Sequence, residues 1–228
     1  MSLENNLINI QKKIKNAVER SPWKQSVELI AVSKLQSVGK IKELYALGQR
    51  SFGENYLQEL QEKKSQFIQE KIVWHFIGSL QSKKIKKLVG NVEYIHSIDR
   101  LEHLIAVNDE AEKQKKVQKV LLQVNVAEED SKSGFDRDEL ESVLLESENL
   151  NSVVVAGLMA MPPLVDDGED NRIYFRAMRK MLTELSSSTR HPDQFINLSM
   201  GTSSDFEVAI EEGATMVRVG SELMGPRN

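Results

Sequence analysis

Short β-prone segments alternate with helical patterns along almost the whole of this chain. Most segments are rich in β-branched or aromatic residues, and apolar residues at spacings of three and four follow them. We count eight segments, at residues 27–33, 50–55, 72–78, 92–98, 117–126, 153–161, 195–201 and 216–221. Strands that alternate with helices form parallel βαβ units, so these segments predict an α/β protein with a closed (β/α)8 TIM barrel. An open doubly wound sheet is the alternative, but no GxGxxG motif follows the first strand.

An additional helix precedes the first strand. Its apolar residues recur at spacings of three and four, as in an amphipathic helix: Leu3, Leu7, Ile10, Ile14 and Val18. Ser21-Pro22 ends it, because a proline disfavours the helical conformation of the residue before it. Residues 1–228 are predicted to form a single domain. Residues 162–170 form a polar loop rather than a linker, since strands and helices resume beyond them.

The composition excludes several classes of protein. The net charge is −4, so no global positive field attracts nucleic acid or anionic lipid. There is no cysteine, which excludes disulfides and thiolate chemistry, and no histidine and acidic residues have metal-ligand spacing. No apolar run approaches the length of a membrane span, and residues 1–13 lack the apolar core of a signal peptide. We expect a cytoplasmic protein without a metal, a nucleic-acid partner or a membrane.

Polar residues and glycines gather at the carboxyl ends of the predicted strands, where a (β/α)8 barrel places its active site. The loops after the seventh and eighth strands, residues 199–205 and 220–225, contain both glycine and hydroxyl residues. Such loops let backbone N–H groups approach an anion, and barrels often bind phosphate there. Residues 203–205 are equally suited to cap a helix, so phosphate binding and capping both remain open. The four lysines at 82–87 are interpreted as a solvated helix face.

Lys34 ends the first predicted strand, although the residues before it read as buried. A lysine at a barrel mouth becomes a nucleophile when desolvation or a cationic neighbour lowers its pKa, and it then forms a Schiff base with a carbonyl group. Two classes combine such a lysine with a phosphate site, namely Schiff-base aldolases that act on sugar phosphates and pyridoxal-phosphate proteins. The alternative is a lysine whose stem is buried and whose ammonium reaches water.

Two further residues require a partner. Arg218 interrupts an apolar strand, and its guanidinium stays charged. Its partner is either a barrel carboxylate such as Asp99, or a bound phosphate or cofactor ring nitrogen. His75 lies between Trp74 and Phe76, and it is either a hydrogen-bonded core histidine or a residue packed beside a planar cofactor.

Several long motifs occur in one order along the chain: LIAVSK (29–34), FGENYLQE (52–59), WHFIGSLQSKK (74–84), IHSIDR (95–100), VNVAEEDSKSGF (124–135), GLMAMPP (157–163), LSMGTSSDFEVAIEEGAT (198–215) and VRVGSELMG (217–225). By these motifs the chain resembles the pyridoxal-phosphate homeostasis proteins, whose barrel is similar to the N-terminal domain of alanine racemase. The resemblance extends from about Leu3 to Gly225, which is nearly the whole chain.

The resemblance implies a cofactor and a site. Lys34 would carry pyridoxal 5′-phosphate (PLP) as a Schiff base, and Arg218 would face the pyridine nitrogen. Asn55 and His75 would line the cofactor pocket, with Met200 against the site. Four residues would hold the phosphate, namely Ser199, Gly201, Gly220 and Ser221.

Four other positions bear on the resemblance. Lys132 matches a family lysine on the loop after the fifth strand, where it would assist loading or release of the cofactor. Leu35, Thr202 and Met224 depart from the residues that are common in the family. None of these three carries a bonding role, so they affect the fine shape of the pocket.

Two functions follow from the resemblance. The first is a PLP-binding protein without catalytic activity, which buffers and delivers the cofactor in the cell. Apo PLP-dependent enzymes are its candidate recipients. Its oligomeric state is expected to be a monomer or a weak dimer. The second is an amino-acid racemase of the alanine racemase type. In those racemases a second domain supplies a tyrosine opposite the lysine, whereas this chain stops shortly after the eighth strand, with Tyr56 as the only tyrosine near the mouth. We therefore expect the binding protein.

Overall fold

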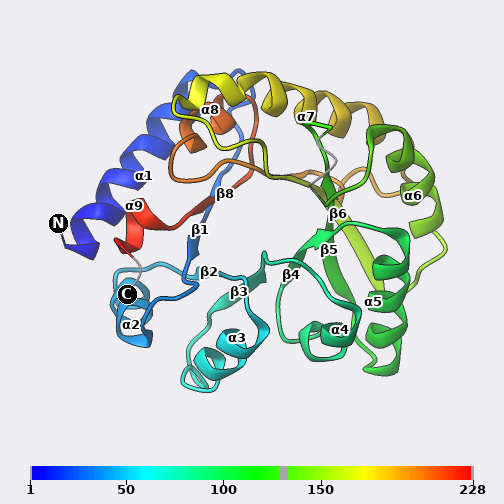
Figure 1. Ribbon diagram of the computed structural model, residues 1–228, viewed down its shortest axis with the longest axis horizontal. Coiled ribbons are helices and arrows are strands. Elements are labelled where there is room, and N and C mark those ends of the chain that lie inside the picture. The colour runs from blue at the N-terminus through cyan, green and yellow to red at the C-terminus, as the bar shows by residue number, and fades with distance from the viewer. Residues whose placement is uncertain (1, 129–132, 227–228) are drawn as a thin grey trace.

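A computed structural model gives the structure of the protein and describes residues 2–128 and 133–226. Eight parallel strands pair in sequence order and close into a barrel, as predicted (Figure 1). Every strand lies within its predicted segment: β1 (Glu28–Val32), β2 (Ser51–Glu54), β3 (Val73–Phe76), β4 (Tyr94–Ile98), β5 (Gln118–Val124), β6 (Val153–Ala160), β7 (Asn197–Ser199) and β8 (Met216–Val219). The carboxyl ends of all eight strands therefore meet at one mouth.

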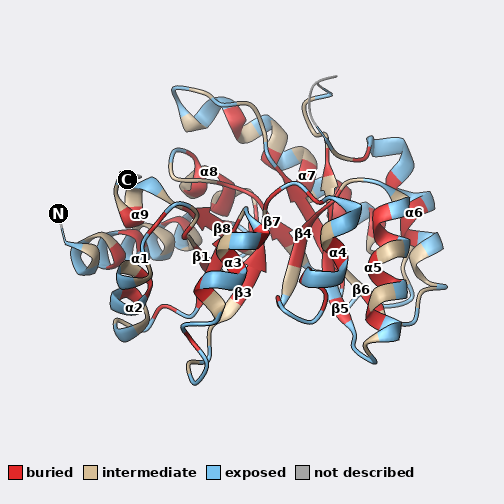
Figure 2. Cartoon of the chain, turned by 60° about the horizontal axis from the view of Figure 1, so that its bottom comes forward, coloured by how far each residue is buried: buried red, intermediate tan, exposed pale blue. Residues whose placement is uncertain are grey.

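Helices surround the strands in an outer ring (Figure 1). Their bounds are α1 (Leu3–Arg20), α2 (Val38–Ala46), α3 (Leu57–Lys64), α4 (Ser82–Leu88), α5 (Leu101–Lys113), α6 (Leu140–Ser147), α7 (Arg172–Leu185), α8 (Phe206–Glu211) and α9 (Ser221–Met224). Figure 2 shows buried residues along the strands and on the helix faces that turn toward them. In α4 the apolar Ile85 and Leu88 are buried while most of its lysines are exposed, as the sequence predicts for a solvated helix.

Helix α1 is the predicted additional helix, and it completes the outer ring. The Ser2 hydroxyl caps its first turn by accepting from the Asn5 N–H, and Ser21 is extended where the helix ends. The helix following β8, α9, has only four residues. Helix α1 packs against α8, α9 and α2 and so covers the wall that a longer last helix would cover.

The core has two parts. Apolar residues of the helices and of the outward strand faces form the larger layer. A small cluster that includes Ile30, Leu121 and Met216 fills part of the barrel interior. The rest of the interior is polar, because His75, His96 and Ser199 are fully buried. This polar interior leads from the bottom of the barrel to the mouth.

Membrane-spanning helices and metal-binding groups are two features on which the sequence makes a prediction. Among the described residues no helix is both long and apolar enough to span a membrane. Within the same residues no group of histidine and acidic side chains is arranged to hold a metal ion. Lys132 lies outside the described residues.

Candidate functional site

A pocket of about 400 Å³ opens at the carboxyl ends of the strands. Five of the nine residues that the sequence predicts for the site lie in its wall: Lys34, Asn55, Arg218, Gly220 and Ser221. The pocket therefore joins the ends of β1, β2 and β8 in one concave surface. Seven further residues complete the wall: Val32, Ile77, Met161, Leu164, Thr202, Ser203 and Ser204.

Lys34 lies in a tight turn directly after β1. The Gln36 N–H donates to the Ser33 carbonyl at 3.1 Å, which closes the turn around Lys34 and Leu35. Leu35 has a φ of 57°, a left-handed conformation that is unfavourable for a residue with a branched side chain. The Lys34 side chain is half-buried and contributes to the pocket wall.

The loops after β7 and β8 form another part of the pocket wall. The Ser203 hydroxyl accepts from the backbone N–H groups of Gly220 at 3.2 Å and Glu222 at 3.5 Å, so it ties the two loops together. The buried Asp205 carboxylate accepts from the Thr202 N–H at 2.6 Å and makes no capping hydrogen bond to α8. Asp205 is the N-cap residue of α8 by position, as the capping interpretation has it, but its carboxylate shapes the loop instead of capping the helix.

Arg218 forms the floor of the pocket and is 4% exposed. Its guanidinium donates to the Ser199 hydroxyl at 2.6 Å and to the Ala160 carbonyl at 2.9 Å. Burial lowers the pKa of Arg218 to about 10, against an opposing effect of the Asp205 charge. The suggested partner Asp99 is wrong, because its carboxylate lies 2.7 Å from His103 Nδ1.

A polar chain crosses the barrel interior behind Arg218. Ser199 Oγ lies 2.9 Å from His96 Nδ1, and His96 Nε2 lies 3.0 Å from His75 Nδ1. The chain ends with a longer contact of 3.5 Å between His75 Nε2 and the Glu28 carboxylate at the start of β1. Arg218 can only donate and a carboxylate can only accept, so an arrangement in which each hydrogen of the chain points toward Glu28 suits both of its ends.

The pKa values of two groups in this chain agree with that assignment. The pKa of His96 lies well below its ordinary value, because burial, His75 and Arg218 all oppose its protonation. Burial raises the pKa of Glu28, but hydrogen bonds from His75 and Ser51 outweigh this effect and leave the pKa below its ordinary value. His96 is thus neutral and Glu28 ionised at neutral pH.

The other four predicted residues lie outside the pocket wall. His75 is fully buried and stacks on Tyr94 with ring centroids 5.5 Å apart, and the Ser199 hydroxyl is occupied by Arg218 and His96. Met200 is buried in the layer between strands and helices. A Cβ on Gly201 would lie 2.6 Å from Ala209 Cβ, so this glycine lets α8 pack closely. Their roles in holding a cofactor stay predictions.

Sequence reasoning missed His96 and part of the pocket wall. His96 lies on the fourth strand, and the alternation of inward positions could have paired it with His75. Met161, Leu164 and Ile77 carry no chemical signature in the sequence, since their contribution is shape.

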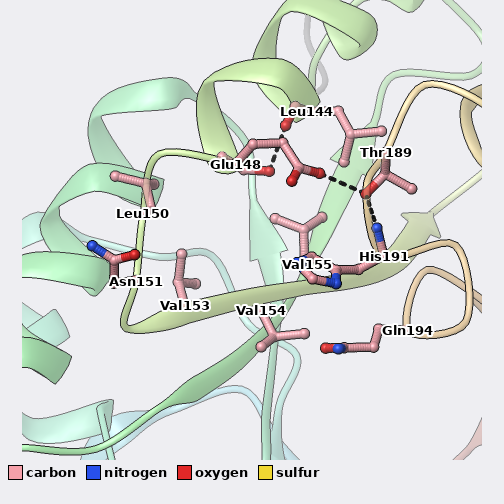
Figure 3. Close-up of a pocket in the computed structure, with 11 residues that line it drawn as sticks. Leu144, Glu148, Leu150, Asn151, Val153, Val154, Val155, Thr189, His191 and Gln194 are labelled. Atoms are coloured by element: carbon pink, nitrogen blue, oxygen red, sulfur yellow. Dashed lines mark hydrogen bonds between the residues drawn. The ribbon is translucent and has the colours of Figure 1, made fainter.

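A second pocket of about 250 Å³ lies at the opposite end of the barrel, where β6 begins (Figure 3). The Glu148 carboxylate accepts from the Thr189 hydroxyl at 2.7 Å at its edge. None of the predicted site residues lines it. The pocket at the mouth is therefore the candidate functional site.

Comparisons with known proteins agree with this fold. The fold is that of the class covered by the family model "Alanine racemase, N-terminal domain", which matches residues 6–228. Relatives named "Pyridoxal phosphate homeostasis protein" are 38% identical in Pasteurella multocida, over 100% of this chain and 99% of that one, and 39% identical in Aquifex aeolicus, over 97% and 96%. The chain belongs to the pyridoxal phosphate homeostasis protein family.

Solved structures show the same similarity. PipY of Synechococcus elongatus with PLP bound superposes with a TM-score of 0.86 at 33% identity, covering 98% of this chain and all of PipY. An alanine racemase of Clostridium difficile superposes with a TM-score of 0.72 at 16% identity over 97% of this chain and 56% of the racemase. The second similarity concerns the fold alone.

Proposed function

We propose that this protein binds PLP in the pocket at the barrel mouth and acts in intracellular PLP homeostasis. Lys34 supplies the amine that condenses with the cofactor aldehyde, with release of one water molecule. The observation that carries the proposal is that Lys34, Arg218 and the hydroxyl-rich loops line one pocket of suitable size. PipY, a relative of the same length, was solved with PLP bound.

The residues of the pocket fit the parts of the cofactor. The Asn55 Oδ1 atom is buried and has no hydrogen-bond partner among the described residues, so it is available to a polar group of a ligand. Ser221 and Ser204 offer hydroxyl groups to a phosphate beside Gly220. When bound, PLP supplies an aldehyde that reacts with amines and an electron-withdrawing ring.

We further propose that the protein holds the cofactor without turning over a substrate. Amino-acid racemisation needs a proton-transfer group on each face of the reacting carbon. Among the described residues of the pocket wall, Lys34 and Arg218 are the ionisable ones, and arginine is a poor base because it stays protonated. Tyr56, the candidate for the opposite face, is 48% exposed and lies outside the wall. Apo PLP-dependent enzymes in the cytoplasm are the proposed recipients.

Borohydride reduction tests the covalent bond. After incubation of the protein with PLP and reduction, peptide mapping is expected to place the pyridoxyl group on Lys34. PLP bonded to a lysine absorbs visible light. The variant Lys34→Ala should lose this absorption band, whereas Lys86→Ala, on the exposed face of α4, should keep it. A pyridoxyl group found mainly on Lys132 or in residues 82–87 would contradict the assignment.

Hydrogen exchange tests the absence of turnover. The PLP-loaded protein is incubated with a panel of L-amino acids in deuterated water, and exchange of the α-proton is followed by NMR. We expect slow or no exchange, together with transfer of PLP to an apo enzyme. Exchange of the α-proton at roughly 1–1000 per second, the range of turnover numbers of ordinary enzymes, would support the racemase function instead.

A further inference from the structure

A buried group of charged residues lies directly behind the turn that carries Lys34. Lys63 of α3 is 5% exposed, and Glu54 at the end of β2 is fully buried. The Lys63 ammonium donates to the Ser33 carbonyl at 2.7 Å, to Glu54 at 2.7 Å and to Glu59 at 2.8 Å. An ammonium has three hydrogens, so these three acceptors use all of them. We call Glu54, Glu59 and Lys63 the charged cluster.

The charged cluster fixes both residues that flank Lys34. On one side, the Ser33 hydroxyl donates to Glu54 at 2.6 Å, in addition to the bond from Lys63 to the Ser33 carbonyl. On the other side, the Leu35 N–H donates to Glu59 at 2.8 Å. The last contact holds Leu35 in its left-handed conformation, which the residue would not adopt by itself. The backbone on either side of Lys34 is therefore tied to β2 and α3.

Stability alone is a weak explanation for such a cluster. Burial of charges opposes folding, and well-packed apolar residues often replace buried ion pairs without loss of stability. Glu54 also keeps one oxygen, Oε2, without a hydrogen-bond partner among the described residues. Burial raises the pKa of Glu54 even though hydrogen bonds from Lys63 and Ser33 lower it, so the carboxylate is held at an energetic penalty. An apolar contact could not hold the Ser33 carbonyl and the Leu35 N–H in place.

We infer that the charged cluster positions Lys34 so that its amine meets the aldehyde of PLP, an inference that rests on the proposed function. The hydrogen bonds of the cluster among the described residues go to the turn and to one another, whereas the loops after β7 and β8 that face a phosphate form other parts of the pocket wall. Formation of a covalent bond is sensitive to misplacement of the reacting atoms by an ångström or less. Loss of the cluster should therefore impair the bond to Lys34 much more than the binding of the rest of the cofactor.

Two ligands distinguish loss of the bond to Lys34 from loss of binding in the rest of the pocket, when both are measured in the variant Lys63→Met. Titration with PLP reports pocket binding and the covalent bond together. Pyridoxine 5′-phosphate, which has an alcohol in place of the aldehyde, reports pocket binding alone. We expect affinity for PLP to fall about tenfold or more and affinity for pyridoxine 5′-phosphate to change less than about twofold. The control is Lys64→Met on the same helix, whose ammonium contacts Asn91 instead, and both affinities should stay as in the wild type.

A second variant covers the case in which Lys63→Met does not fold because the buried Glu54 carboxylate is left without its ion pair. Lys63→Met combined with Glu54→Gln removes the buried charge pair with little change of shape, and circular dichroism checks the fold. We again expect the affinity for PLP to fall and the affinity for pyridoxine 5′-phosphate to change little. Equal losses for both ligands in a folded variant, or no loss for either, would overturn the inference.

A measurement without cofactor distinguishes this inference from the proposed function. Acetylation of Lys34 by an N-hydroxysuccinimide ester, followed by mass spectrometry of its peptide, should be several-fold faster in Lys63→Met because the released turn exposes the amine. Other lysines serve as internal references. If the wild type forms no bond with PLP but this change occurs, the proposed function fails and positioning of Lys34 stands. If Lys34 bonds PLP in the wild type, and the variant keeps both the acetylation rate of Lys34 and the affinities for the two ligands, the proposal that the cluster positions Lys34 fails.

Discussion

Leu35 shows how one residue next to a reactive lysine is held in an unfavourable backbone conformation. Its φ of 57° costs about 1–2 kcal/mol relative to an ordinary conformation. The side chain is 47% exposed, so a substitution loses little buried apolar area. The contact that holds it uses its backbone N–H, and any residue except proline keeps that contact.

We therefore expect Leu35→Asn to raise the free energy of unfolding by about 0.5–1 kcal/mol, because asparagine tolerates the left-handed conformation. Urea unfolding checks this. The control is Leu145→Asn, at a similarly exposed residue within α6, which should bring no gain. A decrease in stability for Leu35→Asn would show that the leucine side chain itself stabilises the turn.

His96 gives the fold a dependence on pH. Its pKa is depressed in the folded protein, chiefly by burial and also by His75 and Arg218, so the unfolded chain takes up a proton near pH 6.5 that the folded chain does not. The contribution of His96 to the free energy of unfolding is therefore fully present above about pH 6.5. Below that pH it falls by about 1.4 kcal/mol per pH unit.

The variant His96→Gln should remove this part of the pH dependence. Unfolding free energies at pH 7.5 and pH 5.5 are expected to differ less in the variant than in the wild type. An unchanged difference would mean that other groups carry the acid sensitivity. The variant also interrupts the polar chain, so its stability at pH 7.5 should be lower than that of the wild type.

At the scale of elements, the loops after β7 and β8 meet at the pocket that Lys34 also lines. Substitution of Ser221 or Ser204 by alanine should weaken PLP binding, since a hydrogen bond to a charged group contributes about 1.5–3 kcal/mol, or roughly tenfold or more in affinity. Equilibrium titration measures the effect. Ser142→Ala on the exposed face of α6 should leave affinity unchanged. Unchanged binding in both loop variants would place the phosphate elsewhere.

Much of the arrangement of elements could be predicted from the sequence. Alternation of β-prone and helical segments located all eight strands, because the period of each pattern depends on local geometry. Lys34, Asn55 and Arg218 were placed at the site because strand ends meet at the barrel mouth. The polar interior and the charged cluster could not be predicted in this way. They join residues such as His96 and Ser199, or Ser33 and Lys63, whose contacts depend on strand register and helix placement.

The whole molecule depends on α1 to close its outer wall. Ile10 is fully buried in this helix, at the layer shared with the barrel. We expect Ile10→Ala to lower the free energy of unfolding by about 2–4 kcal/mol through lost burial and the cavity left behind. Ile8→Ala is the matched control, because Ile8 is 54% exposed on the same helix and should change stability by less than about 0.5 kcal/mol. Thermal or urea unfolding compares the two, and equal effects would contradict a closing role for the buried face.

The contact between α1 and α9 has a consequence in time. The Asn6 side chain donates to the Leu223 carbonyl across 217 positions of sequence. A ribosome adds about 5–20 residues per second, so the first helix leaves it roughly 10–40 seconds before its partner is made. During that interval the part of α1 that packs on α8 and α9 has no partner, and the pocket around Lys34 lacks the loops after β7 and β8. The nascent chain therefore cannot capture its cofactor until β8 has been synthesised and has joined β1.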